Sequence, residues 1–179
     1  MNSQTAPEQH AATLPDLIEK LLQQQGIAYQ LRPTSDSWPA AQQIQASLLC
    51  DTVGTVLTLI PKNHLLDLKV LGALLGRELE PVRDQQLQRI LSKHQLNQLP
   101  GLPILFNSPC VCEQSLLEQS EVCLDSGLTG WSLVISQDGA RTLMGKASLA
   151  RFAVPLAGLS AVSSGIEQDG QDLSDAVQN

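Results

Sequence analysis

The stretch LPGLPILFNSPCVCEQSLLEQSEVCLDSGLTG, residues 99–130, organises the chain, because it joins a glycine-proline loop to two short apolar runs and a second glycine-rich turn. Pro100 and Pro103 restrict the backbone on either side of Gly101, which is conformationally permissive. Such a loop can present its own N–H and C=O groups to a carbonyl or a phosphate. A simple chain reversal before a strand explains the same residues, so both interpretations stay open at this point.

Two cysteines of this stretch predict a strand. Cys110 and Cys112 alternate in an apolar run and would share one face of it. The four cysteines of the chain, at positions 50, 110, 112 and 123, do not form two matched pairs of the kind that bind a metal. We therefore expect them to be small buried hydrophobic residues, and we expect neither a metal nor a cofactor.

The residues before this stretch predict helices that alternate with strands. Apolar residues at helical spacing predict a helix that Thr13 caps and Gly26 ends. Two apolar runs, 47–50 and 55–60, predict a central hairpin with Gly54 at a positive φ. The other expected elements are a strand over 27–31 that Pro33 stops, a short helix over 40–45, a helix over 65–75 that ends at Gly76, an extended piece over 79–82 and a helix capped by Asp84.

The residues after position 120 predict strands over 122–125 and 131–136, a turn at 137–139 and a last helix over 147–152. Together the elements predict one α+β domain over 13–160 with a mixed sheet. The polar head, 1–12, and the acidic tail, 161–179, lack the apolar residues of a core, so we expect the head to be disordered and the tail to be flexible.

The composition excludes some function classes. The formal charge is −7, but Glu8 and four acidic residues after Val162 leave the folded part with 13 acids against 11 bases. Six of these bases lie in 62–93, either as a phosphate-facing patch or as solvated helix faces. Aromatic residues are only 3%, which argues against a reader that stacks bases on rows of Phe or Tyr. With no apolar run near the roughly 18 residues of a membrane span and no leader pattern, we expect a cytoplasmic protein without membrane or DNA partners, of open oligomeric state.

The order of the segments resembles the YbaK/prolyl-tRNA synthetase-associated editing domain family, from about residue 17 to residue 156. The similar segments are the first helix with GIAYQL, the hairpin LLCDTVGTVLTLIP, the run NHLLDLKVL, the loop LPGLP and the run CEQSLLEQSEVCLDSG. The resemblance implies a mixed β-sheet, partly curled into a barrel and flanked by helices, with an aminoacyl pocket between the sheet and the glycine loops.

The resemblance also implies a reaction, which is the hydrolysis of mischarged aminoacyl-tRNA by a positioned water. In that family, backbone groups of a Gly-x-x-x-Pro loop fix the substrate carbonyl, and a lysine holds the nearby charged group. Orientation and charge stabilisation are enough for an activated ester, so no covalent nucleophile is needed. On this resemblance Gly101, Pro103 and Gly127 are the expected substrate-binding residues.

The chain departs from the family pattern where charge matters most. Gln45, or with a one-residue slip Ala46, stands where the lysine is expected, and Leu105 replaces the loop proline. Losing a cation beside a phosphate costs about 1.5–3 kcal/mol, which is tenfold or more in binding or rate. Lys62 can either reach inward as a substitute or lie exposed after the end of its strand. Glu113 is interpreted as a helix cap.

Two functions fit the resemblance, and a third possibility is that the resemblance extends only to the fold and the function is unrelated. The first is an aminoacyl-tRNA editing-type domain, acting in trans on mischarged aminoacyl-tRNA, with hydrolysis weakened or lost because the lysine is absent. The second is a non-catalytic ligand-sensing or interaction module on the same scaffold. No catalytic residue is assigned from the sequence.

Overall fold

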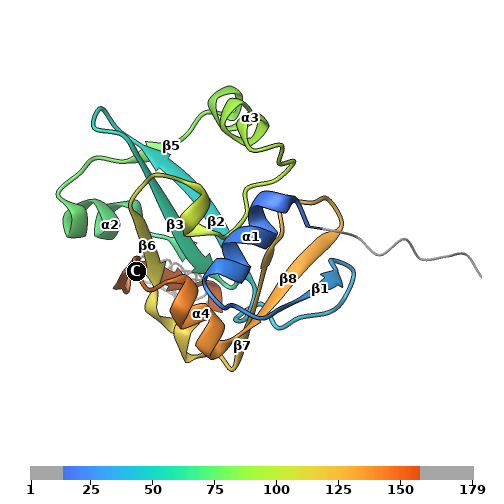
Figure 1. Cartoon of the computed structure of the whole chain (residues 1–179). Helices are drawn as coiled ribbons and strands as arrows, with labels where there is room; N and C mark the ends of the chain where they lie inside the picture. Colours follow the sequence, from blue (N-terminus) through green and yellow to red (C-terminus); the bar gives the residue numbers. More distant parts are fainter. Residues whose placement is uncertain (1–13, 158–179) are drawn as a thin grey trace, which may run out of the picture.

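The computed structural model describes residues 14–157, and in this part of the chain four helices surround three β-sheets (Figure 1). The helices are α1 (Asp16–Gln24), α2 (Leu68–Leu75), α3 (Asp84–Lys93) and α4 (Gln137–Leu143). The strands are β1 (Tyr29–Pro33), β2 (Ile44–Cys50), β3 (Thr55–Pro61), β4 (His64–Leu66), β5 (Glu80–Pro81), β6 (Cys110–Glu113), β7 (Glu121–Asp125), β8 (Trp131–Ser136), β9 (Ser148–Ala150) and β10 (Ala153–Pro155). The α+β class with a mixed sheet flanked by helices is confirmed. The predicted head and tail, and Thr13, lie outside the described residues.

The largest sheet is built around the predicted hairpin. Its order is β5-β2-β3-β6-β9, with β2 and β3 antiparallel and β6 parallel to both β3 and β9. Gly54 closes the β2–β3 turn at φ 153°, as the sequence predicts. The side chains of β3 are buried on both faces: Leu57 and Leu59 belong to the main core, whereas Val56 and Ile60 belong to a smaller core beneath α2. Each such side chain contributes about 1.5–3 kcal/mol of burial free energy.

A second, three-stranded antiparallel sheet has the order β1-β8-β7. The amphipathic α1 packs against the main core through Ile18 and Leu22 and ends at Gln24, two residues before Gly26, which has φ 66°. The two large sheets touch where Cys123 N donates to Gln42 O at 2.8 Å and Gln43 bridges to Cys123. This junction of β2 with β7 positions the site described below.

Two predicted helices are absent: 40–42 form a turn that leads into β2, and 148–150 form a strand, because pairing with distant partners overrides local preference. The segment over 40–45 does not form a helix: Ile44 begins β2 and pairs with Pro61. The segment over 147–152 forms β9, which pairs with β6, and is followed by β10, which pairs with β4.

Three helix ends also differ from expectation. Helix α2 begins at Leu68, because the Asp67 carboxylate accepts the backbone N–H groups of Lys69 and Val70 at 3.0 and 3.1 Å. The predicted turn at 137–139 is instead the start of α4, where Ser136 Oγ accepts Gly139 N–H at 3.2 Å. Asp84 is the first residue of α3 rather than its cap.

Candidate functional site

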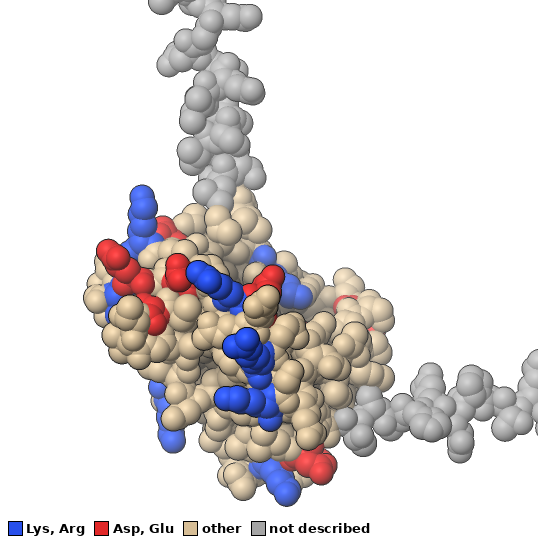
Figure 2. Space-filling model, turned by 90° about the horizontal axis from the view of Figure 1, so that it is seen from above, with Lys and Arg blue, Asp and Glu red and all other residues tan. Residues whose placement is uncertain are grey.

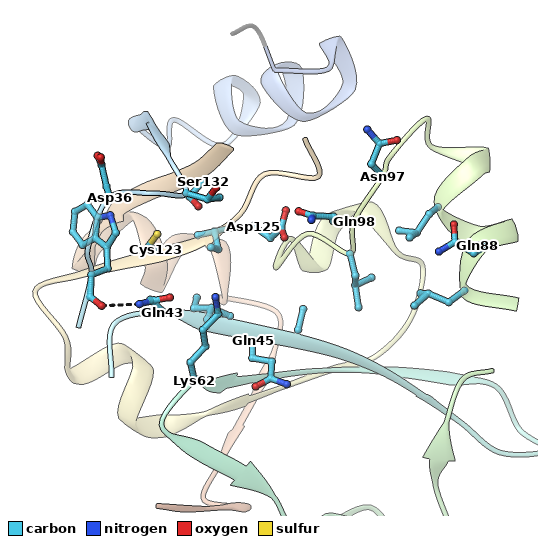
Figure 3. A pocket seen from close by; sticks show the side chains of 18 residues that line it. Asp36, Gln43, Gln45, Lys62, Gln88, Asn97, Gln98, Cys123, Asp125 and Ser132 are labelled. Carbon is cyan, nitrogen blue, oxygen red and sulfur yellow. Dashed lines mark hydrogen bonds between the residues drawn. The ribbon is translucent and has the colours of Figure 1, made fainter. Parts of the chain in front are cut away.

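A pocket of about 420 Å³ lies where β2, β7 and α3 meet (Figure 3). We call it the central pocket. The loops 34–38 and 97–99 complete its walls, and its volume falls within the range of small-molecule sites. The charged and amide side chains that line it are those of Asp36, Gln43, Gln45, Lys62, Gln88, Asn97, Gln98 and Asp125.

Asp125 is the most constrained charge of the central pocket. It ends β7, and its Oδ1 accepts the Gly127 N–H at 2.9 Å. The Gln98 amide faces it and, with its nitrogen toward the carboxylate, donates to Oδ1 at 3.1 Å and to Oδ2 at 2.7 Å. Burial raises the pKa of Asp125, while the Gly127 N–H and the charge of Lys62 oppose that rise. The carboxylate is therefore held in one position at the pocket wall.

Gly127, predicted from the family pattern, closes this turn. Its φ is 81°, a conformation that residues with a Cβ rarely adopt, and a Cβ here would lie 2.7 Å from Leu96 Cδ2. Its carbonyl accepts the N–H of Asn97 at 3.1 Å. The second glycine turn is thus tied both to Asp125 and to the segment that leads into the LPGLP loop.

The two other predicted binding residues, Gly101 and Pro103, lie in different surroundings. Gly101 packs closely between the sheets: its Cβ would lie 3.3 Å from Leu124 Cβ and 3.4 Å from Ile44 Cγ2, both residues of the central pocket. Within residues 14–157 its N–H has no hydrogen-bond partner. Pro103, in contrast, begins a 3-10 turn and lines a separate pocket with Phe106 and Lys146. None of the three predicted substrate-binding residues lines the central pocket: Gly101 and Gly127 contact residues that do, and Pro103 lines the separate pocket.

The positions that lack the family lysine do line the central pocket. Gln45 and Ala46 both contribute to its wall from β2, so no cation comes from this strand. Lys62 does contribute one. It follows β3, its backbone N–H donates to Gln43 O at 2.9 Å, and its side chain rises beside Gln43 (Figure 3). Lys62 is exposed and lines the pocket at the same time.

Several lining residues were not predicted from the sequence. Gln98, Cys123 and Asp125 carried no individual assignment, although Asp125 belongs to the Asp-Ser-Gly turn of the opening stretch, and an Asx-turn pattern is the signal that could have identified it. Burial raises the pKa of the Cys123 thiol, so this cysteine is poorly suited to act as a nucleophile. The expectation of buried, unpaired cysteines is confirmed for Cys110, Cys112 and Cys123.

Glu113 does not cap a helix, contrary to expectation. Its side chain is only 2% exposed, and Oε2 accepts the backbone N–H groups of Phe152 at 2.8 Å and Ala153 at 3.0 Å. The carboxylate therefore fixes the connection between β9 and β10, away from the central pocket.

Two further observations concern the part of the chain between residues 14 and 157. No three His, Cys, Asp or Glu side chains come together there in a way that could hold a metal ion. None of its helices has the length and apolar character needed to cross a membrane.

The chain is similar to solved structures of known fold. Over 82% of its length it matches a "Putative signal transduction protein" from Marinobacter aquaeolei VT8 with 26% identity and a TM-score of 0.76, but it spans only 32% of that protein. It also matches a "putative trans-editing enzyme for prolyl tRNA synthetase" with 18% identity and a TM-score of 0.60, over 78% of this chain and 98% of that one. No curated protein matches the sequence significantly.

A family model gives the assignment. The aminoacyl-tRNA editing domain model matches residues 18–143, which is most of the chain and includes both glycine turns and the central pocket. The fold shared with the trans-editing enzyme agrees with this match. The chain belongs to the aminoacyl-tRNA editing domain family.

Proposed function

We propose that this editing-type domain binds the aminoacylated 3′ end of tRNA in the central pocket and hydrolyses the ester. The observation that carries the proposal is one cavity of about 420 Å³ that is lined by the positioned carboxylate of Asp125 and the cation of Lys62, with the N–H of Gly101, partner-free in the described chain, next to the lining residues Leu124 and Ile44. An aminoacyl-tRNA end offers a matching group to each: an ester carbonyl, an ammonium and a phosphate.

The reaction needs orientation more than a covalent nucleophile. A water oxygen bonds to the ester carbonyl carbon, the bond from that carbon to the ribose oxygen breaks, and a proton passes to the ribose oxygen, which releases amino acid and tRNA. An N–H aimed at the carbonyl oxygen stabilises the negative charge that develops there, and such a donor can contribute about 10²-fold or more in rate. The Gly101 N–H is the candidate donor.

The surface offers support for contact with a polyanion. Seen from above, Lys and Arg side chains gather in the middle of one face, while many of the visible acidic side chains cluster toward one side (Figure 2). Phosphate contacts of this kind supply affinity without sequence information. Action on aminoacyl-tRNA would place the protein in the cytoplasm.

A second candidate is a non-catalytic ligand-sensing module. Two observations favour it: β2 carries Gln45 and Ala46 in place of a lysine, and the Marinobacter protein with the same fold is a "Putative signal transduction protein". This candidate keeps the pocket and gives up the hydrolysis.

The test is release of amino acid from a panel of mischarged tRNAs by the purified chain, measured against buffer. Editing predicts faster release from at least one tRNA, and further acceleration by Gln45→Lys, which returns a cation to β2. Retention of tRNA is measured at several salt concentrations in parallel. Absence of release together with salt-dependent retention would exclude the deacylase and favour the sensing module, whereas absence of both would exclude tRNA as the ligand.

A further inference from the structure

We propose that Lys62 and Asp125 form a two-charge receptor, in which Lys62 binds the 5′-phosphate of the terminal nucleotide and Asp125 binds the α-ammonium of the aminoacyl group. This inference rests on the proposed function and adds to it the residues that orient the substrate. The positive charge that the family pattern expects on β2 would here come from Lys62, the residue that follows β3.

The position of Lys62 follows from the strand pairing. Ile44 and Pro61 are paired at the end of the β2–β3 hairpin, so Lys62 comes directly after the strand that neighbours Gln45. Its N–H bond to Gln43 O, at 2.9 Å, holds its main chain at the junction of the two large sheets. A lysine has a four-carbon stem, so its ammonium can cover the wall that Gln45 and Ala46 leave uncharged.

Lys62 and Asp125 face one cavity without neutralising each other. In the described part of the chain the ion pairs are Arg77–Asp51 and Arg151–Glu118, and neither pocket charge takes part in one. The charge of Lys62 nevertheless acts on the other side of the pocket, because it lowers the pKa of both Asp125 and Cys123, whereas burial raises the pKa of each. Opposite charges kept apart at a cavity favour a ligand that carries both signs.

Asp125 is the better of the two acids for an ammonium. Asp36 also lines the pocket, but it is exposed, and no hydrogen bond in the described chain fixes its side chain. Asp125 is half-buried and oriented by Gly127 and Gln98. A preoriented carboxylate loses little entropy when it accepts an ammonium, and charge-assisted hydrogen bonds are the strong ones.

The test uses a probe that cannot undergo ester hydrolysis, 3′-alanylamino-3′-deoxyadenosine 5′-monophosphate, together with one analogue without the phosphate and one without the α-amino group. Calorimetry measures the affinity of the full chain for each. Lys62→Ala should weaken binding of the complete probe tenfold or more and leave binding of the phosphate-free analogue unchanged. Asp125→Asn should weaken the complete probe and leave the analogue without the amino group unchanged.

Matched variants separate charge from structure. Lys62→Arg should retain most of the affinity, and Gln45→Lys should restore binding to the Lys62→Ala variant, because it supplies the cation from β2. Lys69→Ala, which removes an exposed lysine outside the central pocket, should change nothing. Circular dichroism of each variant checks the fold.

The outcomes distinguish the receptor from the proposed function. The receptor is overturned if the wild type hydrolyses or binds its substrate but Lys62→Ala loses the same affinity for all three probes, or loses none. The editing function would then still stand. Failure of the wild type to bind either tRNA or the complete probe overturns both.

Discussion

Asp51 and Asp125 end two strands in nearly the same way and are used in opposite ways. Asp51 follows β2 and its Oδ1 accepts the N–H groups of Val53 and Gly54, at 2.8 and 3.0 Å, just as Asp125 accepts that of Gly127 at 2.9 Å. Asp51 is closed off by Arg77, whose Nε donates to Oδ2 at 2.7 Å. Asp125 has only neutral hydrogen-bond partners and faces a cavity.

The pKa values record this difference. The hydrogen bond from Arg77 holds the pKa of Asp51 well below its usual range, whereas burial raises that of Asp125. A carboxylate satisfied by a guanidinium supports the fold, and one held by neutral groups beside a pocket remains available to a ligand cation. The same local turn therefore serves stability in one place and binding in the other.

The largest difference in stability between the turns after Asp51 and Asp125 should come from substitution of their glycines. Gly127→Ala forces a Cβ into a left-handed conformation and against Leu96, 2.7 Å away, and should lower the free energy of unfolding by about 3 kcal/mol. Gly54→Ala meets nothing within 4 Å and should cost only the conformational part, about 1 kcal/mol. Urea unfolding of both variants compares them. Equal losses would show that the packing against Leu96 is not what Gly127 provides.

A smaller effect should come from the ion pair. Arg77→Gln removes the cation that lowers the pKa of Asp51, so the variant should unfold at a lower urea concentration than the wild type at pH 7. Because the folded-state pKa of Asp51 is depressed, this contribution is fully present above the unfolded pKa of about 3.9 and is lost progressively as the pH falls from there through the lower folded-state pKa. The gap between the two urea midpoints should therefore stay constant from pH 7 to about pH 5 and begin to narrow between about pH 4 and pH 3. A gap that stays constant down to pH 3 would contradict the role of this carboxylate.

The smallest effect, and one of opposite sign, is expected at the pocket. Burial disfavours the ionised form of Asp125, so Asp125→Asn should leave the urea midpoint at pH 7 unchanged or slightly raised. Because the folded-state pKa is raised, the wild type should gain stability relative to the variant as the pH falls through that pKa. A clear loss of stability at pH 7 would place Asp125 with Asp51, as a structural residue.

The sequence predicts the parts whose cause is local. The hairpin with Gly54, the strands over 122–125 and 131–136 and the helix end at Gly76 follow from alternation and turn chemistry within a few residues. The segment over 147–152 could not be predicted, because β9 exists only through pairing with β6, almost forty residues earlier.

The residues of the candidate site also fall into those with a local sequence signal and those that distant contacts position. Gly101 and Gly127 stay predictions from glycine turns that are visible in a sequence, and the absence of a cation at Gln45, which lines the pocket, could be found by resemblance. The position of Lys62 could not, because it depends on a main-chain bond to Gln43 and on the contact between two sheets. Asp125 needed Gln98 from another loop to become a positioned carboxylate.

The junction at Gln42, Gln43 and Cys123 has a mechanical consequence. The central pocket straddles two sheets that are built as separate hydrogen-bonded ladders, with β2 belonging to one and β7 to the other. A ligand that contacts both Lys62 and Asp125 links the two sheets. A bound ligand would then reduce the sliding of one sheet against the other. Backbone amide protons at the junction would exchange more slowly with solvent, without any change of shape.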